Sequence, residues 1–365
     1  MRHIVFYVAI RVERSNLSTS CAHQAPASPG RTALTKSMPT LETVALRAGV
    51  SRQTVSNALH RPERLAASTR DRVLLAVREA GYRPSLPARQ LATRRSHAVA
   101  VRADRPHDGI SGLVLDAFFH GLAEAGELSG HRVVLYAAQE DQAAEVAVLE
   151  DLLGSATADA VVLTGTDRDD RRPAALSSAG LTFCSFGRPW GEGEPAHDWV
   201  DVDGAAGTAL AVAHLRATGF RSIAFLGWPG LSPTGQDRRE GWLRSVRAGG
   251  GPGPVLEACS DNDVRSAQAA VEQLLRAADP PDAVVCASDT LALGAYRAAR
   301  GLDCRLGVVG FDATPVATAL GFASVAQPVR EVAHTCLELL LPRLRGEQRA
   351  PRGVLLPPQL LVPTP

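Results

Sequence analysis

The chain has little that would anchor it in a membrane or hold it together covalently. None of its 365 residues fall in an apolar run of roughly 18 or more, so no membrane-spanning helix is predicted. Its six cysteines are scattered, with no C-x-x-C pair. This spacing indicates reduced, mostly buried thiols rather than disulfides or a zinc site. These features predict a cytoplasmic protein of two or three domains.

Motifs of common enzyme classes are missing as well. The sequence contains no P-loop, no G-x-S-x-G and no G-x-G-x-x-G after an expected strand. His120, His131, His197 and His214 do not have the spacing of metal ligands. The sequence therefore predicts that the protein is not an enzyme and uses neither a cofactor nor a metal.

Lysine is almost absent, since Lys36 is the only one, and the positive charge is carried by arginine. The net charge of +1 conceals an asymmetry along the chain. Residues 40–95 hold eleven arginines against four acidic residues, a charge of about +7, whereas residues 96–365 sum to about −10. A basic segment attached to an acidic body is typical of a module that binds a polyanion.

The first 37 residues predict a disordered extension. Its apolar start, MRHIVFYVAI, is followed by Arg11, Glu13 and Arg14 before a signal-peptide core could form. The stretch up to Ser37 is polar and contains proline and serine. Met38 directly precedes the first organised residues and is a candidate start of translation, with Met1 as the alternative.

Two short helices with a tight turn are predicted after Met38. Thr40 is the expected N-cap of the first helix, Gly49 its end, and Ser51 the cap of the second. Ala45 allows a second helix to approach, and Val55 packs back into the angle. A small residue, a glycine four positions later and an apolar residue six further on indicate a helix-turn-helix. Three purely structural helices would give the same apolar spacing without the basic charge.

A third helix over 69–80 is predicted to begin with a capping-box-like pair, Ser68 and Asp71, and to end at Gly81. The segments TLETVALRAGVSRQTVSNAL and STRDRVLLAVREAGYRPSLPARQLA resemble the lactose-repressor (LacI) family of bacterial transcription regulators. The resemblance runs unbroken over about residues 39–95. It implies a DNA-binding head over 38–83.

By this resemblance, Arg52, Gln53 and Asn57 read bases in the major groove. Arginine can bind guanine O6 and N7 together, and glutamine or asparagine can bind adenine N6 and N7. Many family members carry arginine where this chain has Asn57, which leaves the preferred base open. The other expected DNA contacts are hydroxyl residues that touch phosphates or cap the helices: Thr40, Ser51, Thr54 and Ser56.

The resemblance also implies a hinge over 84–95 that forms a short helix on DNA and enters the minor groove. Ala88 and Leu91 lie three apart on one face of that helix, and Leu91 is the candidate wedge between base pairs. Pro87 is tolerated only in the first turn, where no N–H bond is lost.

After residue 96, short apolar strands alternate with helical periods. The expected strands are HAVAV, HRVVLYA, ADAVVLTG and LTFCSF, and then RSIAFLG, PVLEA, DAVVCAS and LGVVGF. The expected helices are about 113–128, 141–154, 171–179, 204–217, 236–248, 264–277 and 290–300. Two successive parallel sheets predict an α/β periplasmic-binding-protein-like module of two Rossmann-like lobes. We expect about 96–202 plus 328–352 in one lobe and 203–327 plus the C-terminal tail in the other.

Candidate ligand-binding residues follow the strands at the cleft expected between the lobes. The segment ASDTLALGAYRAARGLDCRLGVVGFDATP also resembles the LacI family, and with Asp104 it places Ser288, Asp289 and Asp312 at carboxyl ends of strands. Carboxylates accept hydrogen bonds from hydroxyl groups, so a sugar is the expected ligand, with Asp312 as the strongest direct contact. Asp289 has an alternative role, as the cap of a helix that begins at Thr290.

The segment PTGQDRREGW adds Arg238, at the place where family members hold the effector with an arginine, and Thr234 as a lesser candidate. Trp190, Phe118 and Phe119 are candidates for stacking on a sugar ring, with core packing as the alternative for each.

These features together predict a cytoplasmic transcriptional regulator, a repressor controlled by a small ligand. We expect it to act as a homodimer on a near-palindromic operator in double-stranded DNA, because one head covers half a site. The alternative is a solute-binding protein of a sugar transporter, which the absence of a signal peptide and the presence of the DNA-reading head disfavour.

Overall fold

A computed structural model describes residues 39–82, 95–104, 110, 112–139, 141–191, 193, 195–230, 232–249 and 256–363. These residues form two units, a small helical head and a larger body that begins at Ser96. The predicted extension 1–37 and the hinge residues Ala88 and Leu91 lie outside the described residues. Across the described ranges, none of the helices is both long enough and apolar enough to cross a membrane.

The head is built from three α-helices and one short 3-10 helix around a small core. The helices are α1 (Leu41–Ala48), α2 (Arg52–His60), η1 (Pro62–Arg64) and α3 (Ala67–Ala80). The Thr40 side chain accepts from the backbone N–H of Thr43, and Gly49 has a left-handed φ of 63°, so both predicted ends of α1 are confirmed. Val44, Val55 and Val73 are fully buried where the helices meet.

The predicted start of the third helix is wrong. The helix α3 begins at Ala67 with Ala66 as its N-cap and no side-chain cap, so Ser68 lies within the first turn. Asp71 instead contacts its neighbour Arg70, at 3.2 Å from Nε. The turn η1 brings the chain to an extended residue at Ala66, and the helix begins there before Ser68 is reached. Gly81 ends the helix with a φ of 62°, as predicted.

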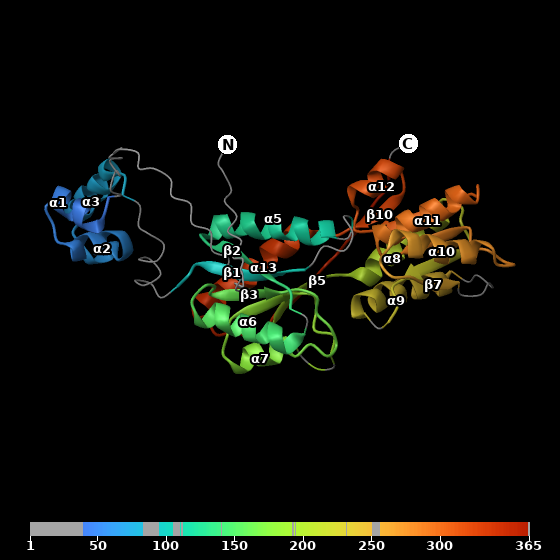
Figure 1. Cartoon of the computed structure of the whole chain (residues 1–365), viewed down its shortest axis with the longest axis horizontal. Helices are drawn as coiled ribbons and strands as arrows, with labels where there is room; N and C mark the ends of the chain where they lie inside the picture. Colours follow the sequence, from blue (N-terminus) through green and yellow to red (C-terminus); the bar gives the residue numbers. More distant parts are fainter. Residues whose placement is uncertain are drawn as a thin grey trace, which may run out of the picture. The chain divides into compact units, whose positions relative to one another are not determined.

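The body holds two parallel sheets, each with helices on both faces (Figure 1). The first has the strand order β11-β5-β4-β3-β1-β2 and is wholly parallel. Its strands are β1 (Ala98–Ala103), β2 (Arg132–Ala137), β3 (Ala160–Leu163), β4 (Phe183–Phe186), β5 (Asp198–Val202) and β11 (Gly353–Leu356). Its helices are α5 (Gly112–Ser129), α6 (Gln142–Gly154), α7 (Arg172–Ser178) and α13 (Val329–Leu344).

The second sheet has the order β12-β10-β9-β8-β6-β7, and only β12 runs antiparallel to its neighbour. Its strands are β6 (Ile223–Gly227), β7 (Glu257–Cys259), β8 (Ala283–Cys286), β9 (Gly307–Phe311), β10 (Ala323–Ala326) and β12 (Gln359–Leu361). Its helices are α8 (Gly204–Ala217), α9 (Pro233–Ala248), α10 (Val264–Leu275), α11 (Asp289–Gly301) and α12 (Pro315–Leu320). The predicted class of two α/β lobes is confirmed.

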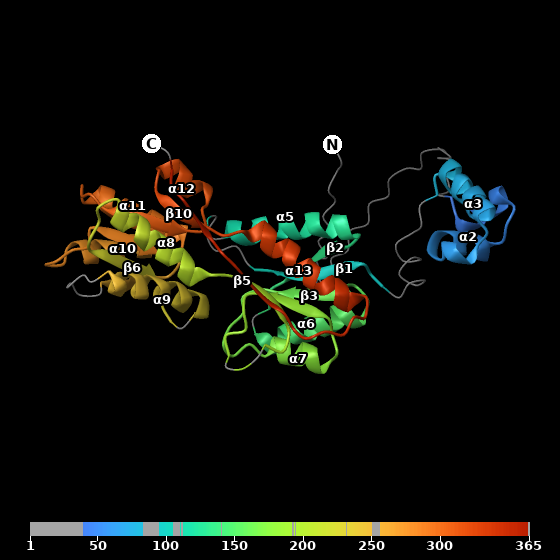
Figure 2. The same ribbon diagram turned by 180° about the vertical axis from the view of Figure 1, so that it is seen from behind.

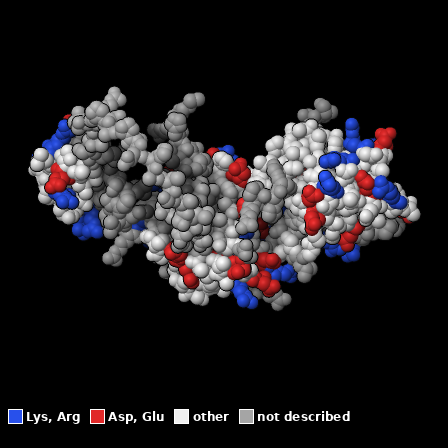
Figure 3. Space-filling model, in the orientation of Figure 1, with Lys and Arg blue, Asp and Glu red and all other residues white. Residues whose placement is uncertain are grey.

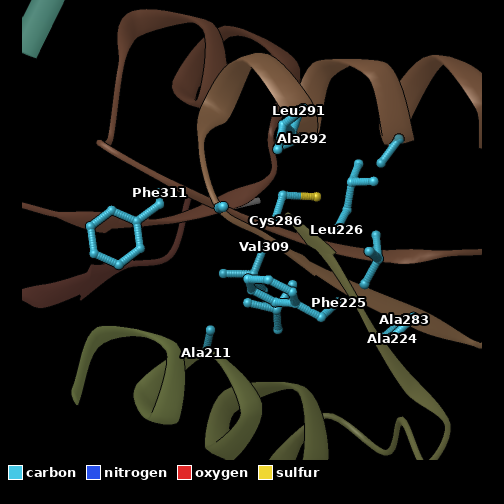
Figure 4. Close-up of a cluster of buried hydrophobic side chains, with 14 of the residues drawn as sticks. Ala211, Ala224, Phe225, Leu226, Ala283, Cys286, Leu291, Ala292, Val309 and Phe311 are labelled. Atoms are coloured by element: carbon cyan, nitrogen blue, oxygen red, sulfur yellow. The ribbon is translucent and has the colours of Figure 1, made fainter. Parts of the chain in front are cut away.

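Each sheet is buried between two helical layers, which explains why its central strands are continuous apolar runs rather than alternating ones. In the first lobe, α5 and α13 cover one face, and α6 and α7 cover the other (Figure 2). In the second lobe, Phe225 and Val309 point toward Ala211 of α8, whereas Cys286 points toward Leu291 of α11 (Figure 4).

The chain passes between the lobes three times, after β5, after β10 and after β11. The first lobe therefore includes the late elements α13 and β11 and extends to Leu356, beyond the expected boundary at 352. Cys184, Cys286 and Cys336 are buried, as expected for reduced core thiols, but Cys259 and Cys304 are exposed.

Candidate functional site

The helix α2 presents a polar face formed by the predicted base-reading residues. Arg52 and Gln53 are exposed, and Asn57, one turn later, is partly exposed. The Gln53 side-chain amide donates to Asn57 Oδ1 at 3.2 Å, so the two amides lie together on this face. The opposite face is fixed in the head core by Val55 and Ala58. The three side chains are thus held on a supported helix and directed away from the core.

Hydroxyl residues at the helix starts are engaged in capping. The Ser51 hydroxyl accepts from the backbone N–H of Thr54 at 3.1 Å and lies 2.9 Å from the Thr54 hydroxyl. Thr40 pairs with Thr43 in the same way at the start of α1. Ser51 and Thr40 are exposed, whereas Thr54 and Ser56 are partly buried. Because exposed helix N-termini favour anions, these caps suit contacts with phosphate groups.

Positive charge exceeds negative charge on the head. Residues 39–82 carry seven arginines against four acidic residues. The body differs, since acidic and basic groups are interspersed on the visible surface of the second lobe (Figure 3). The excess charge thus lies on the unit that presents the polar face of α2.

A cavity of about 360 Å³ opens in the body between the carboxyl ends of the two sheets. Its volume lies within the range of about 300–1,000 Å³ usual for small-molecule sites. Its polar and aromatic lining residues include Asp104, Thr164, Thr166, Trp190, Asp201, Trp228, Thr234, Asp237, Arg238 and Gln327. Four of them, Asp104, Thr164, Trp228 and Gln327, directly follow strands, as expected for ligand sites of parallel sheets, and Thr234, Asp237 and Arg238 belong to α9.

Three of the predicted ligand residues, Asp104, Thr234 and Arg238, line this cavity. Asp312 lies behind the wall: Gln327 donates to its Oδ1 at 2.7 Å, and Arg238 Nη1 lies 3.8 Å from the same oxygen. Ser288 is buried and donates to Asn262 at 2.6 Å. The structure therefore places three predicted residues in the wall of the cleft, puts Asp312, predicted as the strongest direct contact, behind that wall, and leaves Ser288 and Asp289 apart.

Asp289 is a structural carboxylate in this arrangement. It is fully buried and accepts from the backbone N–H and the hydroxyl of Thr314, at 2.6 and 2.8 Å, and from the Ser324 hydroxyl at 2.6 Å. Burial raises its pKa, and these hydrogen bonds oppose the rise. Asp289 does not cap the following helix either, because α11 begins at Asp289 itself and Ser288 is the cap.

Arg238 lies in the second-lobe wall of the cavity, packed against two aromatic rings. Its guanidinium carbon lies 3.7 Å from the centre of the Phe311 ring and 5.3 Å from that of Trp228, and Nη1 donates to the Ala287 carbonyl. Burial lowers the pKa of Arg238, while the Asp312 carboxylate raises it. The guanidinium is therefore fixed and largely dehydrated before any ligand arrives.

The first-lobe wall rests on a buried ionic cluster. Arg172 Nη1 donates to Glu145 at 2.8 Å, and Arg102 donates to the other Glu145 oxygen at 3.1 Å. Arg102 Nε in turn lies 2.9 Å from the Asp104 carboxylate at the cavity. Arg172 also donates to the carbonyls of Thr164 and Gly165, both at 3.0 Å. The cluster thus holds both Asp104 and the loop after β3.

The three aromatic candidates for stacking on a sugar ring lie in different places. Trp190 lines the cavity and donates to the Thr166 hydroxyl at 3.2 Å. Phe118 is fully buried in the first-lobe core, and Phe119 packs against the same core. For both phenylalanines, the core-packing alternative matches their position.

Three polar atoms of cavity-lining residues are buried without a hydrogen-bond partner: Thr164 Oγ1, Trp228 Nε1 and Arg238 Nε. Leaving such groups unpaired costs about 1–3 kcal/mol each, and ligand oxygen atoms could pair with them once these side chains turn toward the cavity. Sequence reasoning missed Thr164 and Trp228. Trp228 directly follows the predicted strand RSIAFLG, and this position was the signal that could have found it; Thr164 lies near the end of the predicted strand ADAVVLTG, which the structure ends one residue earlier, at Leu163.

Two family models match the chain. Bacterial regulatory proteins of the lacI family match residues 40–85, and the periplasmic binding protein-like domain matches residues 212–363. The first covers the helices of the head, and the second covers most of the second lobe together with α13 and β11. These matches define a class in which a helix-turn-helix head precedes a two-lobed binding module.

Relatives match across nearly the whole chain. The HTH-type transcriptional regulator CelR of Thermobifida fusca is 33% identical over 337 residues, covering 89% of this chain and 97% of the relative. RafR of Escherichia coli is 33% identical over 71% of this chain and 75% of its own length. The transcriptional repressor CytR of Escherichia coli is 26% identical over 88% and 95%.

Solved structures of such regulators also superpose on this chain. The CelR–cellobiose complex superposes with a TM-score of 0.66 at 31% identity, covering 89% of this chain and 98% of that one. The lac repressor dimer bound to operator superposes with a TM-score of 0.74 at 25% identity, covering 88% and 97%. The chain belongs to the LacI family of bacterial transcriptional regulators.

Proposed function

We propose that the protein represses transcription by binding operator DNA as a homodimer, and that a saccharide in the cleft between the lobes controls this binding. The cavity carries the proposal, because it combines about 360 Å³ of space with three polar atoms that lack partners. A saccharide supplies oxygen atoms to such groups and carbon faces to Trp190 and Trp228. In this role the protein binds ligands rather than converting them, and it acts in the cytoplasm with DNA.

The saccharide is expected to be uncharged. Asp104, Asp201 and Asp237 line the cavity, and the arginines that contact them are Arg102 and Arg188. A phosphate group would meet these carboxylates and would compete with existing ion pairs for its cations. Cellobiose is the first candidate, because the relative CelR forms a complex with it.

The cleft contacts are assigned by their position in the wall. Arg238 donates through its guanidinium to a ligand oxygen, Asp104 accepts from a ligand hydroxyl, and Thr234 is a weaker partner. Asp312 orients Arg238 and Gln327 from behind, at 3.8 and 2.7 Å. In the head, Arg52, Gln53 and Asn57 contact base edges, while Thr40, Ser51, Thr54 and Ser56 contact the backbone of the DNA.

A pair of variants tests the two halves separately. A binding site is first selected from randomised duplex DNA with the full chain and then measured by fluorescence anisotropy, with and without cellobiose. Gln53→Ala should weaken the selected site by about 1–3 kcal/mol, with little change on random DNA, and should leave cellobiose calorimetry unchanged. Arg238→Lys, which keeps the charge but loses the planar fork, should weaken cellobiose binding and spare DNA binding.

Two outcomes would contradict the proposal. If no DNA sequence were enriched although cellobiose bound, the solute-binding alternative would be favoured. If Gln53→Ala weakened selected and random DNA equally, its side chain would be a phosphate contact rather than a base reader.

A further inference from the structure

The first crossover between the lobes, at Val202–Asp203–Gly204, passes beside Arg188. Arg188 follows β4 in the first lobe, and its Nε lies 2.6 Å from the Asp201 carboxylate at the end of β5. Its Nη2 donates to the Val202 carbonyl at 3.3 Å. Arg188 therefore fixes the chain on the first-lobe side of the crossover.

The same arginine reaches the second lobe. Arg188 Nη2 lies 3.4 Å from Asp237 Oδ2 in the first turns of α9. That oxygen also accepts from the backbone N–H of Ala205, the second residue of α8, at 3.1 Å. Asp237 thus holds the chain just after the crossover, and the ion pair between Arg188 and Asp237 spans it.

Close packing makes this arrangement specific. A Cβ at Gly204 would lie 2.8 Å from Asp237 Oδ2, so glycine is what lets α9 approach the crossover. The side chains of Arg188 and Asp237 are only 20% and 16% exposed. An ion pair at this depth is screened less by salt than a surface pair.

The ion pair borders the cleft directly. Asp201, Val202, Gly204 and Asp237 all line the cavity, and Arg238, the next residue of α9, is its main cationic wall. The Arg188 guanidinium also lies over the ring of Trp190, 4.7 Å from its centre. A ligand that contacts Trp190 and Arg238 therefore touches the immediate neighbours of both members of the pair.

We propose that Arg188 is a positioning residue. Its contacts on both sides of the crossover, which we call the clasp, hold the two lobes in one arrangement, and the binding of effector and of DNA depends on that arrangement. This inference rests on the proposed function for its regulatory meaning, since an effector changes operator affinity only through different affinities for two arrangements. A second bridge between the lobes, from Arg168 Nη2 to Gln236 Oε1 at 2.6 Å, is exposed and has a neutral acceptor. It is expected to contribute less.

Hydrogen–deuterium exchange on the full chain, without added sugar, tests the clasp itself. The variant is Arg188→Gln. The matched control is Arg239→Gln, which removes an exposed ion pair to Glu257 within the second lobe. Arg188→Gln should raise exchange at the Ala205 and Ala206 amides at least tenfold over the control, with the amides of β3 and β8 unchanged. If Arg188→Gln does not fold, Asp237→Asn removes the same pair from the other lobe.

A second measurement tests the regulatory part. The ratio of operator affinities with and without cellobiose should change at least threefold in Arg188→Gln, change less in Arg188→Lys, and stay at the wild-type value in Arg239→Gln. Exchange at the crossover that matches the control, or that rises equally throughout both lobes, would overturn the clasp. If cellobiose did not change the operator affinity of the wild type, the proposed effector would be refuted. The exchange result would still show whether Arg188 holds the crossover.

Discussion

The helix α2 of the head and the cleft between the lobes are built in opposite ways. In the head, Arg52, Gln53 and Asn57 lie within two turns of one helix, and their positions depend on a core of about a dozen nearby residues. The cleft is lined by residues at or just after the ends of seven strands and by residues of α5 and α9, and residues as distant as Asp104 and Gln327 share it. A local motif can therefore present the first site, whereas the whole fold is needed to form the second.

The two sites also differ in how their arginines are held. Arg52 is exposed, whereas Arg238 is 6% exposed and already lies against Phe311 and Asp312. Substitutions on the polar face of α2 should thus change binding without changing stability. Substitutions behind the cleft should change both.

The largest expected effect comes from the ionic cluster behind the first-lobe wall. Glu145→Ala removes the partner shared by Arg172 and Arg102 and leaves buried charge uncompensated, which costs about 3–5 kcal/mol of body stability. Chemical denaturation should show a destabilised body and an unchanged head transition. A loss below about 1 kcal/mol would mean that the cluster does not support the wall.

Acid should act on the body through Asp198, which is fully buried and contacts Arg343 and Arg349 at 2.5 and 2.8 Å. Burial alone would raise its pKa, but the hydrogen bonds from both arginines outweigh this and hold the pKa below its usual value. Its contribution is thus present above the unfolded-state pKa of about 3.9 and lost as the pH falls through the lower folded value.

Asp198→Asn should therefore cost about 2–3 kcal/mol at pH 7, because it weakens hydrogen bonds to a charged group. The difference from the wild type should shrink steadily below about pH 4. Urea unfolding at pH 7, 5 and 3 measures this. A difference that stayed constant over the three pH values would contradict the assignment.

Two glycines with similar backbone angles allow a matched comparison of the head and the cleft. Gly49 and Gly165 have φ values of 63° and 60°, so alanine at either site is strained by about 1–2 kcal/mol. A Cβ at Gly49 meets nothing within 4 Å, but at Gly165 it would lie 2.5 Å from Arg102 Nη2. Gly165→Ala should thus also weaken cellobiose binding by displacing Arg102 from Asp104, as calorimetry can measure.

The smallest expected effect belongs to the cap of α2. Ser51→Ala removes the acceptor for the Thr54 N–H and should cost the head about 1 kcal/mol. Thermal unfolding of the head, followed separately from the body, is the measurement. If Ser51→Ala bound DNA as tightly as the wild type, after correction for the folded fraction, the hydroxyl would have no role beyond capping.

Sequence patterns predicted the local features well because they depend on nearby residues. The caps at Thr40 and Ser51 and the turn at Gly49 follow from a few positions each. The start of α3 was misplaced because an extended backbone at Ala66 replaced a side-chain cap. A polar residue before a helix is therefore only one way of starting it.

The cleft was predicted in outline but not in its contacts. Position after a strand identified Asp104 as a cleft residue, but it could not show that Asp312 lies behind the wall or that Asp289 is satisfied by Thr314 and Ser324. The contact between Arg188 and Asp237 joins residues 49 positions apart in different lobes. No local pattern encodes such a pair, so only the assembled lobes reveal it.

The threefold passage of the chain between the lobes has a consequence for biosynthesis. The first lobe packs α13 and β11 against strands made about 150 residues earlier, so its core stays open until Leu356 has left the ribosome. The head needs only the segment up to Gly81 and can fold long before. Nascent chains thus carry a folded DNA-reading unit ahead of any lobe that an effector could address. On the proposed function, control by ligand begins only once the last strands are in place.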